Sequence, residues 1–477
     1  MEINTKCQVF TPDAIVKQLL DIVGYKKNIF GKKVAENSCG DGNILVEIVK
    51  RYIQDGLKQN HSIFMIKKGL ESDIYGAEID ANHRNNSIQR LDDIAREYDI
   101  KDVKWNIYNG DFLKQEIRHK FRFVIGNPPY ITYKEMTIEE RSSLRNHFQT
   151  CIYGKFDMCY AFTEASINSL DQAGKLAYLV PSNVFKNHFA DSLRTMLLTG
   201  LTDIYDFKNQ KLFDSKLTAS AIIVYNAGKD TKKVKYHNII EGTKIEIPKT
   251  SLIGKWQFTE INSQQKQNHT RFGDVFHTAS SIATLLNEVY IIDKFSDLGE
   301  CIQVGECKIE KELLRTAISP RSKKYNKTEF VIFPYYYEDA KLMRYSDQEF
   351  EKKYPLGAYY LNQYQEKLSK RDSDKGSSWF EYGRSQALAH LNQNKLLIST
   401  IITDKVKTYL LNNDEIPTSG LYITPKAEYG LDVAKQILYT DEFLNYVKSI
   451  GVVANGNSFR VSPKDINNFT FESELLT

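Results

Sequence analysis

The sequence predicts a two-domain α/β protein, with a Rossmann-like sheet of about seven strands in residues 1–245 and a mixed α+β domain in residues 246–477. From about residue 33 to 240, short apolar runs alternate with helical stretches, the pattern of βαβ units around a parallel sheet. Beyond this region the alternation weakens, and Lys, Asn and Tyr become more frequent. The 477 residues also exceed what a single hydrophobic core usually supports.

The expected elements follow one another in a regular order. A first strand at residues 34–35 leads into a loop at residues 38–42, after which apolar residues recur at helical spacing. The same alternation predicts a helix at residues 157–170 and further strands at residues 74–77, 103–108, 123–126, 175–180 and 221–225. In the second half, strand-like segments at residues 396–402 and 421–424 lie in less regular sequence, which indicates a mixed α+β domain.

The tetrapeptide Asn127-Pro128-Pro129-Tyr130 follows directly after one of the expected strands. Proline fixes φ and has no N–H group, so this loop presents carbonyl acceptors beside the Asn127 amide oxygen and the Tyr130 ring. That combination suits a planar amino group. Two acceptors holding its hydrogens would draw the nitrogen toward tetrahedral geometry and restore its nucleophilicity. The alternative is a plain turn, but Asn before and Tyr after a Pro-Pro pair at a strand end favour a functional loop.

Polar residues also follow other expected strands, at the sheet edge where ligands bind in open α/β folds. The loop at residues 38–42 contains Gly40 and Gly42 but lacks the third glycine of the dinucleotide fingerprint, which favours a nucleoside without phosphate. Glu78 is placed to accept hydrogen bonds from ribose hydroxyls. Asp111 is placed to accept from an adenine amino group, with Phe112 covering the ring. Each of these side chains could instead be a solvated loop acid or a core aromatic.

The net charge of +4 permits a nucleic-acid partner without requiring one, so any phosphate-binding surface must be local. Two basic clusters are candidates for phosphate contact, and either could equally be a solvated face. The first contains Arg321, Lys323, Lys324 and Lys327, and the second contains Lys367, Lys370 and Arg371.

The six cysteines show neither a C-x-x-C pair nor Cys/His metal spacing, so we expect free thiols, a reducing compartment and no metal. The first residues lack the apolar core of a signal peptide, and no apolar run approaches the length of a membrane span. We therefore expect a cytoplasmic protein without a membrane partner.

In this order the motifs resemble the amino-group DNA methyltransferases that use S-adenosylmethionine, specifically the adenine-N6 class with the catalytic domain first and the target-recognition domain last. The resemblance covers nearly the whole chain and implies a methyltransferase sheet in residues 1–245. Phe10-Thr11-Pro12 is similar to the opening cofactor motif of that family. The resemblance implies that the cofactor is bound by Thr11, Glu36, Cys39, Gly40, Glu78, Ile79, Asp111, Phe112, Asn127 and Phe156.

The resemblance also assigns catalytic roles. It implies that Asn127 and Pro128 accept hydrogen bonds from the amino group of a flipped adenine, and that Tyr130 stacks on the ring. Phe213 and Lys216 lie where the family places a second stacking aromatic and a lysine near the base. Their alternative roles are a core Phe and a surface Lys.

The second half resembles the recognition domains of methyltransferases from type II restriction-modification systems, in particular modification enzymes paired with shifted-cleavage endonucleases. The similar segments are residues 281–285, 289–292 and 379–386. They imply double-stranded DNA as the partner. Arg384 is a candidate DNA contact by its chemistry, or an ion-pair partner within the domain. Only ten residues precede Thr11, so we expect any cognate restriction endonuclease to be a separate protein rather than a fused domain.

The glycine loop departs from the family pattern. Residues 37–42 read Asn-Ser-Cys-Gly-Asp-Gly, where the family usually has Pro-Ala-Cys-Gly-Ser-Gly. Asp41 is expected to cap the following helix; the alternative is contact with the ammonium group of the cofactor.

Three other functions remain open. An N4-cytosine DNA methyltransferase is chemically adjacent, although its loop more often begins with Ser. Glutamine-N5 protein methyltransferases share the Asn-Pro-Pro-Tyr loop but are much shorter. A DNA-binding specificity module with a decayed catalytic fold is disfavoured, because Glu78, Asp111 and the complete catalytic loop are retained.

Overall fold

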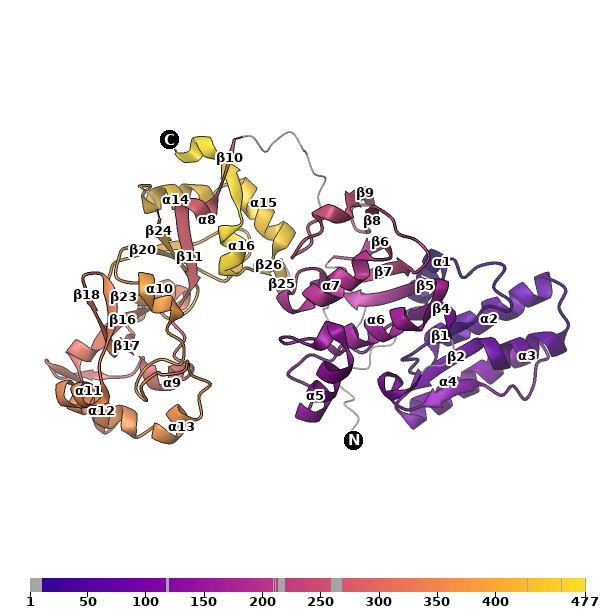
Figure 1. Cartoon of the computed structure of the whole chain (residues 1–477), viewed down its shortest axis with the longest axis horizontal. Coiled ribbons are helices and arrows are strands. Elements are labelled where there is room, and N and C mark those ends of the chain that lie inside the picture. Colours follow the sequence, from indigo (N-terminus) through magenta and orange to yellow (C-terminus); the bar gives the residue numbers. More distant parts are fainter. Residues whose placement is uncertain are drawn as a thin grey trace. The chain divides into compact units, whose positions relative to one another are not determined.

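The computed structural model describes residues 11–116, 120–208, 210, 212, 219–258, 268–426, 428–455 and 457–476. The chain divides into two compact units, Met1–Ile261 and Asn262–Thr477 (Figure 1). The change of composition near residue 245 falls within β9 (Thr243–Pro248), a strand of the first unit. The structural boundary therefore lies further along the chain than the composition indicates.

The first unit contains a sheet of nine strands among the described residues, in the order β3-β2-β1-β4-β5-β7-β6-β8-β9. The five strands from β3 to β5 run parallel, and β7 is antiparallel to both of its neighbours. The prediction of a Rossmann-like α/β sheet is confirmed, with β8 and β9 extending the seven expected strands. The strands are β1 (Val34–Glu36), β2 (Ile74–Glu78), β3 (Asn106–Asn109), β4 (Phe121–Gly126), β5 (Leu170–Pro181), β6 (Leu201–Asp206), β7 (Ser220–Asn226), β8 (Lys233–Asn238) and β9.

Helices cover both faces of this sheet. Successive side chains of a strand point to opposite faces, so Val34 and Ala35 of β1 belong to two different hydrophobic cores. The core that contains Val34 is completed by α1 (Asp13–Val23), α2 (Asn43–Lys58), α3 (Ile63–Asp73) and α4 (Ala81–Arg96). The core that contains Ala35 is completed by α5 (Ile138–His147), α6 (Met158–Ser169) and α7 (Asp191–Leu198).

The second unit combines short helices with several small sheets, as expected for a mixed α+β domain. Its two larger sheets have the orders β11-β24-β20-β22 and β12-β17-β16-β23. The segment expected as one strand at residues 396–402 is divided into β20 and β21. The strands are β10 (His269–Arg271), β11 (Phe276–Ser280), β12 (Ile291–Ile292), β13 (Ser296–Asp297), β14 (Cys301–Val304), β15 (Cys307–Glu310), β16 (Leu314–Ile318), β17 (Phe330–Ile332), β18 (Tyr335–Glu338), β19 (Lys341–Arg344), β20 (Lys395–Ile398), β21 (Ile401–Ile402), β22 (Thr408–Leu411), β23 (Glu415–Pro417), β24 (Leu421–Pro425), β25 (Val452–Asn455), β26 (Ser458–Arg460) and β27 (Thr470–Glu472).

Apart from α10, the helices of the second unit contribute to two main hydrophobic cores. One core is built around β12, β16 and β17, and the other around β11, β20 and β24. The helices are α8 (Phe272–Val275), α9 (Asn287–Tyr290), α10 (Pro320–Tyr325), α11 (Asp347–Lys353), α12 (Pro355–Asn362), α13 (Gln365–Ser369), α14 (Leu431–Leu438), α15 (Asp441–Ile450) and α16 (Pro463–Asn467).

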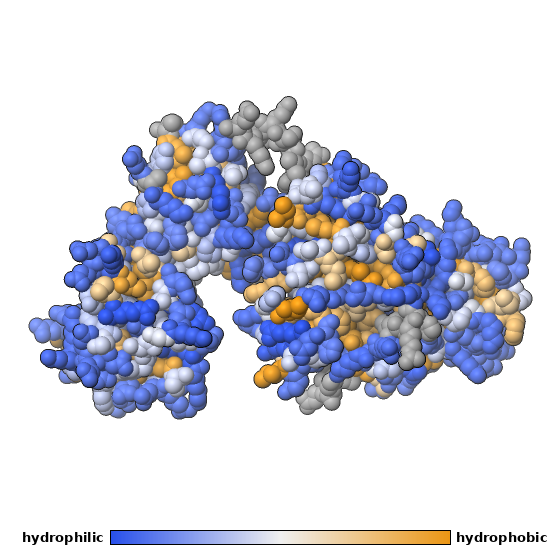
Figure 2. All heavy atoms as spheres, in the orientation of Figure 1, coloured by the Kyte–Doolittle hydropathy of each residue, from blue (hydrophilic) through white to orange (hydrophobic). Residues whose placement is uncertain are grey.

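The exposed face of each unit in Figure 2 is mainly hydrophilic, with apolar residues gathered in small groups. Within the described ranges, no helix is long and apolar enough to cross a membrane. The same residues contain no group of three or more His, Cys, Asp or Glu side chains placed to hold a metal ion.

Candidate active site

A cavity of about 800 Å³ lies at the carboxyl ends of β1, β2, β3 and β4, the edge at which open α/β sheets bind ligands. α5 and α6 supply further walls, including Ser143 and Met158. The structure thus gathers strand-end residues from distant parts of the sequence around one space. The residues predicted from the sequence that line it are Thr11, Glu36, Cys39, Gly40, Glu78, Ile79, Asp111, Phe112, Asn127, Pro128 and Tyr130.

The carboxylate of Glu78 is held at the cavity wall by two backbone donors. The Gly40 N–H donates to its Oε2 at 2.8 Å, and the Asp80 N–H donates to its Oε1 at 3.0 Å. A carboxylate oxygen has two lone pairs, so each oxygen retains capacity for a ligand hydroxyl. The fixed carboxylate can therefore accept one hydrogen bond at each oxygen from the two hydroxyls of a vicinal diol.

Glu36 is a buried acid in the same cavity. Its side chain is 2% exposed, and its Oε2 has no hydrogen-bond partner among the described residues. Burial raises the pKa of this carboxyl well above its usual value. A buried polar atom without a partner is costly, so the position fits a polar group supplied by a ligand.

The wall beyond β3 combines an acid with stacked aromatic rings. Asp111 caps a short 3₁₀ turn, accepting from the Leu113 N–H at 3.0 Å. The following Phe112 is buried, and its ring stacks with Phe162 of α6 at a centroid distance of 6.0 Å and an interplanar angle of 24°. Both rings line the cavity. The sequence did not predict Phe162 as a site residue, although the i, i+4 spacing of Met158 and Phe162 places both on one face of α6.

Phe156 is not among the residues that line the cavity. Its ring is fully buried in the core, where the edge of Tyr133 approaches it and the Arg145 guanidinium lies 5.6 Å from its centroid. It precedes α6, and the residues of α6 that face the cavity are Met158 and Phe162. The structure therefore does not bring Phe156 to the predicted ligand, and a cavity-lining aromatic lies six positions later in the chain.

The Asn127-Pro128-Pro129-Tyr130 loop begins where β4 ends, and all four residues line the cavity. The Asn127 Nδ2 donates to Thr11 Oγ1 at 3.2 Å, which places the side-chain oxygen on the other side of the amide group. The Tyr130 hydroxyl donates to the Leu179 carbonyl of β5 at 2.9 Å. Burial raises the pKa of Tyr130 well above its usual value, so the hydroxyl stays a donor. Both side chains are therefore held at fixed orientations.

Asn37 and Ser38 replace the usual Pro-Ala of the family, and both make specific contacts. The Asn37 amide is buried, donating to Ser166 Oγ of α6 at 2.7 Å and accepting from the Tyr178 hydroxyl of β5. The Ser38 hydroxyl donates to the Asn127 carbonyl at 3.0 Å. The departure from the family pattern therefore ties the glycine loop to α6, β5 and the loop that carries Asn127.

Asp41 does not cap α2, contrary to the expectation from the sequence. The N-cap residue is Gly42, and no side chain caps the helix. The Asp41 carboxylate instead contacts His83 Nδ1 at 2.6 Å and accepts from Asn86 Nδ2 at 3.2 Å. These partners are supplied by α4 and draw the carboxylate away from the start of α2.

The remaining candidates lie elsewhere. Phe213 and Lys216 fall outside the described residues. In the second unit, Arg384 forms ion pairs with Asp372 at 2.7 Å and with Asp374 at 3.4 Å. The structure therefore shows Arg384 as an ion-pair partner within the second unit, one of the two roles predicted from the sequence.

The strand order of the first unit and the cavity at the strand ends define a Rossmann-like α/β fold with a candidate ligand site at the carboxyl edge of the sheet, as the sequence predicted. Residues 28–213 match the family model of the Eco57I restriction-modification methylases.

Individual relatives extend the similarity into the second unit. The chain is 23% identical to the type II restriction enzyme and methyltransferase RM.Eco57I of Escherichia coli, over 93% of this chain and 54% of that protein. It is also 23% identical to the type II methyltransferase M.BstVI of Geobacillus stearothermophilus, over 95% of this chain and 87% of that protein. The chain thus spans about half the length of the first relative.

A solved structure supports the fold across both units. The type IIL restriction-modification enzyme MmeI, solved in complex with DNA, aligns with a TM-score of 0.61 at 14% identity, over 96% of this chain and 64% of that chain. The predicted resemblance to modification enzymes of type II restriction-modification systems is confirmed by the family match and these relatives.

Proposed function

We propose that this chain is a site-specific DNA methyltransferase that transfers a methyl group from S-adenosylmethionine to N6 of an adenine flipped out of duplex DNA. It would protect DNA in a restriction-modification system. The observation that carries the proposal is a single cavity in which the Asn127-Pro128-Pro129-Tyr130 loop faces the same space as Glu78.

The residues of the cavity fit the proposed cofactor. Glu78 would accept from the two ribose hydroxyls, and Asp111 from the adenine amino group. Phe112 and Phe162 offer apolar surface for the adenine ring, and the buried Glu36 offers a polar partner. When bound, S-adenosylmethionine supplies an electrophilic methyl group on a positively charged sulfur.

The catalytic loop would act on the nucleophile. The N6 lone pair of adenine is delocalised into the ring, which makes the amino group a weak nucleophile. The Asn127 side-chain oxygen and the Pro128 carbonyl would accept its two hydrogens and favour a tetrahedral nitrogen. Because methylation makes this nitrogen acidic, its proton can leave afterwards without a strong base in the protein.

Tyr130 would hold the flipped base. Extruding a base costs a few kcal/mol, and stacking on one aromatic face returns about 1–3 kcal/mol. The hydrogen bond from the Tyr130 hydroxyl to Leu179 fixes the ring before the base arrives. The ring therefore loses little additional freedom on stacking.

The second unit would select the DNA site. Similarity to M.BstVI spans both units, which supports a shared arrangement of catalytic and recognition parts. Arg384 could read DNA only after leaving Asp372 and Asp374, so its proposed contact requires that network to open. Such a large second unit also favours a base within DNA over a protein glutamine as the acceptor.

Substitution of the catalytic loop tests the mechanism. We expect Asn127→Ala to lower the methylation rate by about 10²-fold or more, as does removing one preorganised hydrogen-bonding group from an active site. Tyr130→Ala should lower it by about 5- to 150-fold, the equivalent of one lost stacking contact. Calorimetry should show that both variants still bind S-adenosylmethionine. Asn85→Ala, which removes an exposed amide on α4 outside the cavity, is the matched control.

Product analysis tests the acceptor. DNA from cells that express the protein, digested to nucleosides, should contain N6-methyladenine, and methylation-sensitive sequencing of the undigested DNA should place it in one sequence context. N4-methylcytosine would support the alternative base.

Full activity in both Asn127→Ala and Tyr130→Ala would contradict the proposed mechanism.

A further inference from the structure

α10 of the second unit presents one of the two basic clusters seen in the sequence. Residues 319–328 contain four basic side chains and no acidic one. A capping box between Ser319 and Ser322 begins the helix, and Asn326 in the left-handed conformation (φ 49°) ends it. Ser322 is buried, whereas its basic neighbours are exposed. α10 is therefore a short helix with defined ends whose basic side chains are exposed.

Most of these cations are not neutralised. Lys323 pairs with Glu415 at 2.9 Å. Arg321, Lys324 and Lys327 form no ion pair with any residue that the structure describes. Tyr325 lies among them and is 58% exposed, with the Lys324 ammonium 5.0 Å from its ring centroid. The exposed surface of α10 thus carries three unpaired positive charges beside a hydroxyl that can donate.

The other basic cluster is engaged within the second unit. Lys367 pairs with Glu288 at 2.7 Å, and Lys370 pairs with Glu366 on its own helix. Arg371 donates to the Thr284 carbonyl at 2.8 Å and to the Glu381 carbonyl at 3.0 Å, which makes it a structural link. The structure therefore separates two clusters that the sequence could not distinguish.

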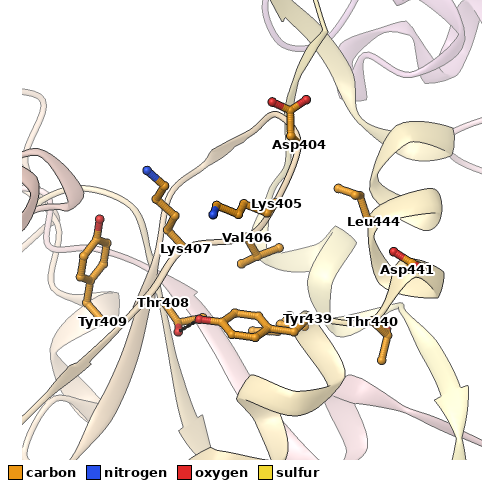
Figure 3. Close-up of a pocket in the computed structure, with 11 residues that line it drawn as sticks. Asp404, Lys405, Val406, Lys407, Thr408, Tyr409, Tyr439, Thr440, Asp441 and Leu444 are labelled. Atoms are coloured by element: carbon orange, nitrogen blue, oxygen red, sulfur yellow. Dashed lines mark hydrogen bonds between the residues drawn. The ribbon is translucent and has the colours of Figure 1, made fainter.

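A pocket of about 540 Å³ in the second unit is a second place where lysine side chains are gathered (Figure 3). It contains Lys405 and Lys407, but Asp404 and Asp441 line the same space. Its charge is therefore balanced, unlike that of α10. A polyanion would gain less from this pocket.

From this contrast we propose that the α10 surface, formed by Arg321, Lys324, Tyr325 and Lys327, binds the phosphate backbone of duplex DNA. The proposal rests on the proposed function and specifies which face of the second unit contacts the substrate. Guanidinium, ammonium and tyrosine hydroxyl groups are all common phosphate donors. Phosphate contacts position a protein on DNA without reading its sequence, so the α10 contact should be independent of sequence.

Salt dependence of binding tests the proposal, because each phosphate contact contributes about 0.9 to the slope of log affinity against log salt concentration. The full chain is compared with Arg321→Gln/Lys324→Gln and with Lys367→Gln/Lys370→Gln, two variants that each lose two positive charges. The probe is a short duplex oligonucleotide of arbitrary sequence. We expect the slope to fall by about two in the α10 variant and to stay unchanged in the other. Lys327→Gln alone should lower it by about one.

The outcomes separate this inference from the proposed function. If the full chain methylates DNA but both double variants lose the same slope, net charge alone explains the effect and the α10 surface is excluded. An unchanged slope in the α10 variants also overturns the inference. If the full chain neither binds duplex DNA at low salt nor methylates it, the proposed function falls and the inference with it. Thermal unfolding of each variant confirms that the exposed substitutions leave the fold intact.

Discussion

The ionisation of His83 depends on one neighbouring carboxylate. The hydrogen bond that the protonated His83 ring donates to the Asp41 carboxylate is the largest influence and raises the pKa of His83 above its usual 6.5, with smaller contributions from the charges of Asp80 and Glu78. The stabilisation from the charged pair is therefore full below about pH 6.5 and is lost as the pH rises through the raised pKa. We expect Asp41→Asn to lower the pKa of His83, measured by NMR titration of its ring protons. The variant should lose more stability at pH 6 than at pH 9; equal losses would contradict the assignment.

Some of the site residues could be predicted because a strand end fixes their position. Glu78 ends β2, and Asp111 and Asn127 lie just beyond β3 and β4; parallel strands bring these carboxyl ends to one edge. Phe156 does not line the cavity, and its position was harder to predict because the direction of a residue that precedes a helix depends on how the helix packs. Phe162 faces the cavity through the rotation of α6, which depends on tertiary contacts that the sequence does not reveal.

Asn37 connects three elements through one buried amide. Its contacts to Ser166 of α6 and Tyr178 of β5 hold the loop between β1 and α2. We expect Asn37→Ala to lower the free energy of unfolding by about 1–3 kcal/mol, because it leaves two buried hydroxyls with fewer partners. Denaturant unfolding measures the change. Ser38→Ala removes a less buried hydrogen bond and should cost less; a larger loss from Ser38→Ala would contradict the importance of the Asn37 network.

The last two strands of the first unit, β8 and β9, show why the compact unit extends beyond the change of composition near residue 245. β8 alternates exposed with less exposed residues, and half of the residues of β9 are exposed, so neither strand forms an apolar run in the sequence. Their register is set by pairing, with β8 beside β6 and β9 beside β8. Antiparallel strands near the edge of a sheet can keep one face in solvent, and β9, with β8 as its one neighbour, is the strand at this edge. A change of composition therefore marks the sheet edge rather than the end of the folded unit.

The two units have separate hydrophobic cores, so we expect the first to fold without the second. Its core continues beyond β9, because Leu252 and Trp256 are buried in it and Phe258 stacks on Tyr236 at 4.3 Å. Burying one large apolar side chain contributes about 1.5–3 kcal/mol, against a total stability of about 5–15 kcal/mol. A fragment of residues 1–245 loses several such groups and half of β9.

We therefore expect a fragment of residues 1–258 to unfold cooperatively and to bind S-adenosylmethionine, and a fragment of residues 1–245 to do neither. Circular dichroism on heating and calorimetry distinguish the two fragments. If the second unit selects the DNA site, the 1–258 fragment should lose site-specific methylation while keeping cofactor affinity, because the described residues proposed to bind the cofactor and the base all lie in the first unit. Sequencing that detects N6-methyladenine would show this loss. A 1–258 fragment that still methylates one sequence context would place recognition in the first unit instead.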